Sequence, residues 1–374
     1  MDIFLTILTF FFIYYLGSLV VYGFGNLKKP IDNKLKQNHS VSVIVAVRNG
    51  EKALPSLLSD LQNQDYHEKL EFIIVDDDST DSSANLIKSI SKQDSRFIYA
   101  QSKTGKTNLS HKKKALDSGI SVATGEILLF TDVDCRMGKN WVKNTSEYFQ
   151  TNIDYIIGYS DTLPTKKWAS IFQKLDMFML MIAAKGITQQ GIPWASIGQN
   201  QGYRKSLYKK VGGFDKISDC LQGDDSLFLQ VCRKIGNIKA VFVDDPETYV
   251  TGRTEETWSG FLRQRMRWAG DANLMIKYNK LFFVTIISTF IGNIFPIILI
   301  ILSIFQDNYY YFSIIILLKL FIEVLLYILG SIKYRKPIDL FEFVFWFLIQ
   351  MPYIVLMGIM SFWAQNFGWK GRKA

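Results

Sequence analysis

The chain has 374 residues, 48% of them hydrophobic, and a formal net charge of +9; this length predicts at least two structural units. Its three cysteines lack paired spacing and its three histidines are scattered, which argues against a disulfide framework and a zinc cluster. Much of the positive charge lies beside hydrophobic segments and not in an aromatic-interleaved stripe, so membrane lipids and no nucleic acid are expected as partners.

The first predicted element is an uncharged segment, Ile3 to Phe24, long enough to cross a bilayer core of roughly 30 Å. A cleaved signal peptide is the alternative, but no positive charge precedes the run and no small-residue cleavage site follows it. By the positive-inside rule, Lys28 and Lys29 should keep the following domain in the cytoplasm. We therefore predict a retained membrane anchor at residues 1–27.

Four short apolar runs in the middle of the chain predict buried strands of a parallel sheet, with helical patterns between them. The runs are Val41–Val47, Glu71–Val75, Glu126–Phe130 and Ala240–Val243, and the helical patterns include Pro55–Gln64 and Ser82–Ser91. This alternation predicts an α/β domain, which we place at residues 40–278.

Polar residues follow three of these runs directly, namely Arg48–Gly50, Asp76–Asp81 and Thr131–Asp134. Ligands of open α/β sheets bind at the carboxyl ends of the strands. Two carboxylate clusters at one edge repel each other unless a cation or donated hydrogen bonds compensate. Asp132 and Asp134 are two residues apart, so an extended backbone would point both side chains the same way, toward a Mg²⁺ or Mn²⁺ ion.

Two phosphate-binding motifs are disfavoured. Thr104–Thr107 resembles the end of a P-loop, but Ala100 occupies the position of its first glycine. The first predicted strand is not followed by G-x-G-x-x-G, which disfavours a dinucleotide oxidoreductase.

The apolar segment Trp168–Lys185 predicts a helix that lies in the membrane surface or, equally, in the core of the soluble domain. Three further spans are predicted within residues 281–363, at Leu281–Phe305, Tyr310–Gly330 and Leu340–Trp363. Lys319 and Glu323 inside them are four residues apart and can pair on a helix.

The basic loop Lys333–Lys336 should face the cytoplasm. The basic tail at 364–374 would then lie outside, against the same rule, unless the last segment lies partly in the interface. The sequence leaves both arrangements open.

Six blocks in the chain carry a family resemblance. They are VSVIVAVRNG (41–50), VDDDSTD (75–81), TDVD (131–134), GYRKSLYKKVGGFD (202–215), GDDSLF (223–228) and QRMRW (264–268). In this order, over about residues 40–275, they resemble the family 2 glycosyltransferases. The resemblance implies a GT-A-type, mostly parallel sheet with helices on both faces, in addition to one N-terminal and about three C-terminal transmembrane helices.

The resemblance also implies how a nucleotide-sugar donor is bound. Asp77, with Asp76 beside it, would read the uracil of a UDP-sugar, and the backbone around Ala46 and Arg48 would flank the base. Lys112 matches the family's lysine before an Ala-Leu-Asn block, although considered alone it would be an ordinary solvated helix start.

The remaining donor contacts involve the metal. By resemblance, Asp132 would lie near the ribose and the metal, and Asp134 would bind the Mg²⁺ or Mn²⁺ that bridges the diphosphate. Asp117 stands where the family usually has Asn.

Asp225 resembles the general base that takes the proton of the attacking acceptor hydroxyl in inverting transfer. Relatives commonly have Glu at the position of Asp224, which leaves open which of the two aspartates is the general base. The structural alternative, for Asp224 in particular, is an acidic residue that stabilises the N-terminus of a helix.

Gln264, Arg267 and Trp268 match the Q-x-x-R-W signature, in which Arg267 would pair with the diphosphate and the other two would contact the acceptor. An amphipathic helix at the membrane surface is the alternative, and both can hold.

The resemblance therefore implies an enzyme that performs inverting, metal-dependent transfer from a UDP-sugar to a lipid or lipid-linked glycan, as in ceramide glucosyltransferase-like relatives. Processive polysaccharide synthesis, as in the smaller poly-N-acetylglucosamine synthases, is the alternative. A catalytically silent scaffold and a transporter are disfavoured, because the expected carboxylates are present and a transporter would leave the soluble motifs unexplained. The expected location is the plasma membrane of a bacterium, with the catalytic domain in the cytoplasm.

Overall fold

The structure is a computed structural model that describes residues 3–29, 39–149, 152–220 and 222–366. The chain forms two compact units. We call Lys29–Leu163 with Pro193–Arg253 the sheet unit, and Met1–Lys28 with Pro164–Ile192 and Thr254–Phe367 the helical unit. From residue 367 on, the predicted basic tail lies outside the described residues.

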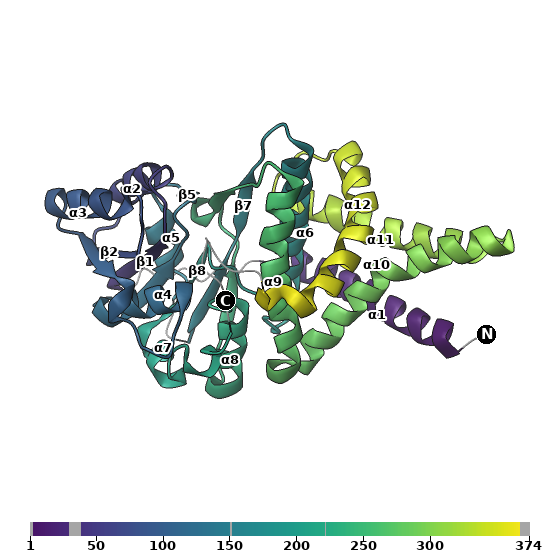
Figure 1. Cartoon of the computed structure of the whole chain (residues 1–374), viewed down its shortest axis with the longest axis horizontal. Helices are drawn as coiled ribbons and strands as arrows, with labels where there is room; N and C mark the ends of the chain where they lie inside the picture. The colour runs from purple at the N-terminus through teal and green to yellow at the C-terminus, as the bar shows by residue number, and fades with distance from the viewer. Residues whose placement is uncertain (1–2, 30–38, 150–151, 221, 367–374) are drawn as a thin grey trace. The chain divides into compact units, whose positions relative to one another are not determined.

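The sheet unit contains a seven-stranded sheet (Figure 1) in the order β3-β2-β1-β4-β8-β6-β9. Its strands are β1 (Val41–Val47), β2 (Leu70–Asp76), β3 (Phe97–Gln101), β4 (Ile127–Phe130), β6 (Tyr155–Gly158), β8 (Gln201–Arg204) and β9 (Ala240–Val243). All neighbours pair in parallel except those of β8, which runs antiparallel to β4 and β6. The predicted mostly parallel sheet is confirmed, and the four predicted strands correspond to β1, β2, β4 and β9.

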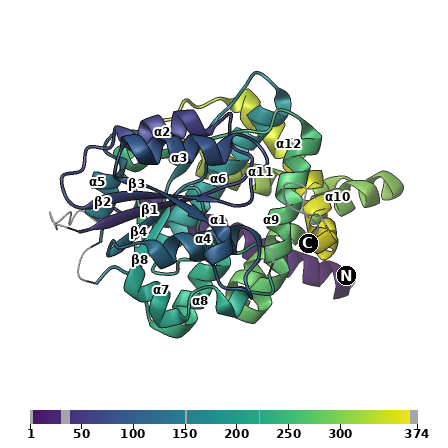
Figure 2. The same ribbon diagram turned by 60° about the vertical axis from the view of Figure 1, so that its left-hand side comes forward.

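Helices cover both faces of this sheet. Figure 2 shows α2 (Leu54–Gln62) and α3 (Ser83–Gln93) on one face and α4 (His111–Val122) on the other. The remaining helices of eleven residues or fewer in the unit are α5 (Trp141–Ser146), α7 (Lys205–Val211) and α8 (Ser226–Gly236).

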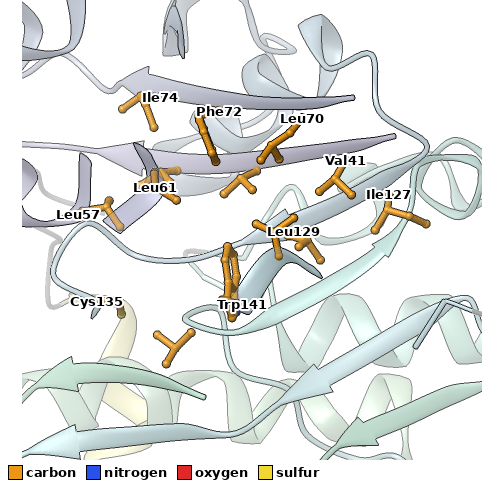
Figure 3. Close-up of a cluster of buried hydrophobic side chains, with 14 of the residues drawn as sticks. Val41, Leu57, Leu61, Leu70, Phe72, Ile74, Ile127, Leu129, Cys135 and Trp141 are labelled. Atoms are coloured by element: carbon orange, nitrogen blue, oxygen red, sulfur yellow. The ribbon is translucent and has the colours of Figure 1, made fainter. Parts of the chain in front are cut away.

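Alternation along β1 explains this layering, because successive side chains of a strand point to opposite faces. Val43 and Val45 belong to one buried cluster with leucines of α2 and with Trp141 of α5. Figure 3 labels Leu57, Leu61 and Trp141 of this cluster. Ile44 points to the other face, where a Cβ at Gly119 would lie only 2.7 Å from its Cγ2, so a glycine lets α4 approach closely. Each fully buried Val or Leu side chain contributes about 1.5–3 kcal/mol relative to its exposed state.

A second, three-stranded sheet has the order β5-β10-β7. It consists of β5 (Arg136–Met137), β7 (Ser160–Leu163) and β10 (Val250–Arg253). These strands, like β3, β6 and β8, were not expected from apolar runs, because they are short and several carry polar residues.

The helical unit is built from both ends of the chain and its middle. Its long helices are α1 (Ile3–Leu27), α6 (Trp168–Gln189), α9 (Trp258–Tyr278), α10 (Lys280–Gln306), α11 (Tyr310–Lys333) and α12 (Leu340–Met360). Among the described residues, α1, α10, α11 and the segment Leu340–Trp363 are long and apolar enough to cross a membrane. One N-terminal and three C-terminal apolar helices are therefore confirmed, and Figure 1 shows α1, α10 and α11 side by side.

The helix α6 packs against α1 at a crossing of two glycines. A Cβ at Gly25 would lie 1.9 Å from the carbonyl oxygen of Gly186, so the two backbones touch. Asn26 Nδ2 donates to the carbonyl of Ile182 at 2.8 Å across the same crossing. Most of α6 is buried, and it belongs to the helical unit and not to the core of the sheet unit, whereas its predicted position in the membrane surface stays a prediction.

Inside the apolar helices, Lys319 and Glu323 form the predicted ion pair, and both are buried. Tyr15 of α1 and Gln350 of α12 also donate hydrogen bonds to Glu323. Every charge in this cluster thus has a partner.

Candidate active site

The carboxyl ends of β2, β1 and β4 lie next to one another at one edge of the sheet, because these strands are parallel neighbours. Arg48, directly after β1, donates from Nη1 to the backbone carbonyls of Asp77 and Asp78 at 2.8 and 3.0 Å. Asn49 Oδ1 accepts a hydrogen bond from Thr80 N at 2.8 Å. The loops after β1 and β2 are therefore joined into one rim.

The acidic pair predicted to bind the base lies on this rim. Asp77 is buried, and its N–H donates to the carbonyl of Val47 at 2.8 Å. Asp76 ends β2, and its Oδ1 accepts from Ser79 N at 3.1 Å. Ala46 is half-buried in β1, opposite Val75. Hydrogen bonds within the rim thus hold the predicted donor residues Arg48, Asp76 and Asp77 in place.

Lys112, in the first turn of α4, links two carboxylates from distant parts of the sequence. Its Nζ lies 2.9 Å from Asp132 Oδ1 and 3.1 Å from Asp224 Oδ2. Burial opposes protonation of Lys112, but these two carboxylates outweigh it and hold its pKa well above the ordinary value. The adjacent Lys113 is fully buried and donates to the carbonyls of Ile217 and Cys220. An ordinary solvated helix start, the alternative for Lys112 considered alone, is therefore wrong.

Asp225 caps the N-terminus of α8. Its Oδ1 accepts from Ser226 N at 2.5 Å, and its Oδ2 accepts from Gly198 N at 3.3 Å. Asp225 is half-buried. Burial, and next the negative charge of Asp224, raise the pKa of Asp225 to about 7. The capping acid is therefore Asp225, whereas Asp224 is buried against Lys112.

A second layer of polar residues fixes the backbone behind these aspartates. Gln201 Nε2 donates to the carbonyl of Asp224 at 3.0 Å, and Gln201 Oε1 accepts from the hydroxyls of Tyr155 and Ser196 at 2.5 and 2.9 Å. Ser226 Oγ donates to the carbonyl of Ser196 at 2.9 Å. The sequence argument missed these residues, although the polar run before Gly202 was an available signal.

The spacing argument assumed an extended backbone at Asp132 and Asp134, but the backbone there forms a turn. Cys135 N donates to the carbonyl of Asp132 at 3.2 Å, which closes a turn over Val133 and Asp134. Burial, and next the negative charges of Asp132 and Asp134, raise the pKa of the buried Cys135 thiol, so both carboxylates lie near it. No group of three His, Cys, Asp or Glu side chains among the described residues could hold a metal ion by itself.

The replacement of the family's Asn by Asp117 is accommodated by local hydrogen bonds. Its Oδ2 accepts from Lys106 N at 2.9 Å and its Oδ1 accepts from the Tyr208 hydroxyl at 2.7 Å. Lys106 in turn pairs with Asp215 at 2.7 Å, so the P-loop-like segment has a structural role.

The Q-x-x-R-W residues lie on α9 in the helical unit. Gln264 Oε1 accepts from Gln173 Nε2 at 3.0 Å. Arg267 is half-buried, and this burial lowers its pKa. The guanidinium of Arg265 lies 4.2 Å from the ring centroid of Trp268. The convergence of Gln264, Arg267 and Trp268 with the carboxylates of the sheet unit stays a prediction.

Two family models match the chain. One, described as Glycosyl transferase family 2, matches residues 42–212, and the other, described as Glycosyl transferase family group 2, matches residues 128–363. The second match covers more than half of the chain. The chain belongs to the family 2 glycosyltransferases.

Individual relatives agree with this. A probable glycosyltransferase of Sulfolobus acidocaldarius is 24% identical over 287 residues, which are 73% of this chain and 60% of that protein. The poly-beta-1,6-N-acetyl-D-glucosamine synthase of Staphylococcus epidermidis is 25% identical over 271 residues, 70% of this chain and 62% of that protein. The chain thus spans about three-fifths of the length of these curated relatives.

A solved structure confirms the fold. A mannosyltransferase from Pyrobaculum calidifontis, in complex with GDP-Man and Mn²⁺, superposes with a TM-score of 0.60 at 17% identity, covering 96% of this chain and 98% of that one. The α/β architecture is therefore of the GT-A type, with one N-terminal and three C-terminal apolar helices.

Proposed function

We propose that this enzyme transfers a sugar, with inversion, from a UDP-sugar to a lipid or lipid-linked glycan at the membrane. The observation that carries the proposal is Asp225, a carboxyl group with a pKa of about 7 beside the Lys112–Asp224 pair at the carboxyl edge of the sheet. A general base is most effective when its pKa lies near the working pH.

Asp225 is the better base of the two aspartates. Asp224 is buried and its Oδ2 lies 3.1 Å from Lys112 Nζ, so its carboxylate already has a partner and is closed to an acceptor hydroxyl. Asp225 retains exposed surface, and its raised pKa gives it the tendency to take a proton. As the acceptor hydroxyl oxygen bonds to the anomeric carbon, the bond to the diphosphate breaks and the hydroxyl proton passes to Asp225.

The donor would bind on the rim formed by the loops after β1 and β2. Asp77, with Asp76, would accept hydrogen bonds from the base, and the backbone around Ala46 and Arg48 would flank it. The bonds from Arg48 to this rim support a preformed site. The choice of a UDP-sugar as donor rests on the family resemblance. Because the similar mannosyltransferase was solved with GDP-Man, GDP-sugars are the donors to test against it.

The site fits Mg²⁺ or Mn²⁺, which needs only one or two protein carboxylates when a diphosphate and water complete its shell. Asp134 and Asp132 would hold the ion, and the Mn²⁺ in the mannosyltransferase complex supports this. When bound, the ion supplies positive charge for the leaving diphosphate. Without the ion, the positive charge of Lys112 balances the negative charge of Asp132.

On the helical unit, Arg267 would pair with the diphosphate, and Gln264 and Trp268 would contact the acceptor. We place a catalytic domain at residues 40–278 in the cytoplasm, between an anchor at 1–27 and a membrane region at 281–363, in the plasma membrane of a bacterium. Thiol labelling of single cysteines introduced at Lys333 and Lys336, in right-side-out and inverted vesicles, tests this orientation.

Processive synthesis of a polysaccharide is the second candidate, favoured by the similarity to the staphylococcal synthase. Single transfer is preferred, because a polymer channel usually needs more spanning helices than the four candidates described here.

A donor screen tests the proposal. The purified full chain is incubated with UDP-sugars and GDP-sugars, Mn²⁺, and diacylglycerol, polyprenyl phosphate or octyl β-D-glucoside as acceptor probes. UDP release with one donor, and a lipid product gaining one sugar by mass spectrometry, are expected. Release of GDP alone would contradict a UDP-sugar donor. Long polymer formed without added lipid would contradict the transfer of a single sugar.

A further inference from the structure

The helix α6 contacts two consecutive residues of the Q-x-x-R-W motif. Gln173 and Asp176 are three residues apart, so they share one face of the helix. Gln173 Nε2 donates to Gln264 Oε1 at 3.0 Å, and Asp176 Oδ2 lies 2.7 Å from Arg265 Nη2. Gln173, Asp176 and Arg265 are all buried. The motif is therefore supported from behind by one buried face of α6.

The orientation of both amides in this contact follows from a backbone donor. The N–H of Glu255 donates to Gln173 Oε1 at 2.8 Å, and a backbone N–H can only donate. Gln173 therefore donates from its NH₂ group to Gln264, and Gln264 accepts this hydrogen bond with Oε1. The NH₂ group of Gln264 is left as the end that can meet a ligand, so this side chain offers a donor and not an acceptor.

The neighbouring pair acts on Trp268. The Arg265 guanidinium lies 4.2 Å from the Trp268 ring centroid and 5.2 Å from that of Phe261. Among the described residues, the Arg265 guanidinium lies close to the Asp176 carboxylate but makes no hydrogen bond of good geometry. Its orientation is thus set by one charge and two aromatic faces, and a planar guanidinium stacks on a ring as an ammonium cannot.

We propose that α6 is the positioning element of the motif: Gln173 orients Gln264 as a hydrogen-bond donor, and Asp176 with Arg265 holds the ring of Trp268. The acceptor this arrangement fits is a hydroxyl-rich ring, whose oxygens accept from Gln264 and whose apolar face lies against the indole. The inference rests on the proposed acceptor role of Gln264 and Trp268. Gln173, Asp176 and Arg265 are positioning residues and touch no substrate.

The sharpest test is Gln173→Glu. A glutamate still accepts from the Glu255 N–H but cannot donate to Gln264, so the Gln264 amide must turn over and present its oxygen. We expect the acceptor KM to rise about tenfold, as for the loss of one hydrogen bond to a ligand, with the donor KM within about twofold. Gln189→Glu, the same change at the end of α6, is the matched control and should leave both constants unchanged.

Two further variants keep the test decisive if Gln173→Glu does not fold. Gln264→Glu can still accept from Gln173 but offers no donor, so it should lose acceptor binding as fully as Gln264→Ala. Arg265→Lys keeps the charge beside Asp176 but not the stacking plane. It should raise the acceptor KM several-fold at a nearly unchanged melting temperature, whereas Arg263→Lys on the exposed side of α9 should do neither.

The measurements use full-length enzyme in detergent, with octyl β-D-glucoside as the acceptor because it presents a hydroxyl-rich ring. If the unchanged enzyme transfers sugar to diacylglycerol or polyprenyl phosphate but not to octyl β-D-glucoside, the inferred ring acceptor is wrong. Nucleotide release to water alone should be unchanged in all the positioning variants. Wild-type acceptor KM in Gln264→Glu and Arg265→Lys would overturn the inference if Gln264→Ala and Trp268→Ala are impaired. If Gln264→Ala and Trp268→Ala keep the acceptor KM of the unchanged enzyme, the proposed role of Gln264 and Trp268 in acceptor binding is itself wrong.

Discussion

At the scale of single residues, Asp225 gives the most direct prediction about the chemistry. A base accepts the proton only when it is ionised, so the acceptor kcat/KM should rise about tenfold per pH unit up to about pH 7 and then level off. Asp225→Asn should lower kcat by about 10²–10⁴-fold with donor binding nearly intact. The measurement is nucleotide release from pH 5.5 to 8.5, with calorimetric titration of UDP into the variant.

The neighbouring carboxylate supplies the control for this pH profile. The charge of Asp224 helps to raise the pKa of Asp225, so Asp224→Asn should move the acidic limb to lower pH. A limb that stays in place in Asp224→Asn, or normal turnover in Asp225→Asn, would contradict the assignment of the base.

Asp134 is predicted to act on the donor through the metal and not on the proton. Asp134→Ala should weaken UDP binding in Mn²⁺ about tenfold or more, because one of few protein ligands is lost. UDP binding in EDTA should match that of the unchanged enzyme, which separates metal binding from general damage. Equal UDP affinity of both proteins in Mn²⁺ would exclude Asp134 as a ligand.

At the scale of secondary-structure elements, the crossing of α1 and α6 depends on its glycines. A Cβ at Gly25 would lie 1.9 Å from the Gly186 carbonyl oxygen, so the helices would have to separate. Gly25→Ala should destabilise the protein by about 1–3 kcal/mol through overpacking. Gly17→Ala on the same helix meets nothing within 4 Å and should be neutral or slightly stabilising. Thermal unfolding in detergent compares the two, and equal midpoints would argue against this close crossing.

Elements also show what the sequence could and could not predict. The runs at β1, β2, β4 and β9 were readable because buried parallel strands are continuously apolar. The strand β8 begins with Gln201 and Gly202, and its antiparallel pairing with β4 accompanies the contacts of Gly198 with Asp225 and of Gln201 with Asp224. Side chains whose roles arise from such tertiary pairing, including Gln173 and Asp176 of α6, leave no local pattern to detect.

At the scale of the whole molecule, the family motifs predicted the sheet unit well because they mark strand ends, which the fold collects at one edge. The helical unit was predicted only as separate spans. Its assembly from both ends of the chain depends on contacts such as Tyr15 with Glu323, and pairing of this kind is not encoded by hydropathy.

The buried cluster around Glu323 tests that assembly. Glu323→Leu leaves the fully buried Lys319 without its carboxylate and should cost about 3–5 kcal/mol, whereas a hydrophobic replacement of both partners can be nearly neutral. We therefore expect Lys319→Met/Glu323→Leu to recover most of the melting temperature and transfer activity that Glu323→Leu loses. Recovery would mean that the pair stabilises the association of α1, α11 and α12 and has no part in the reaction. A double variant that is stable but inactive would instead give these charges a functional role, because loss of an ion pair that only joins helices cannot abolish turnover in a folded enzyme.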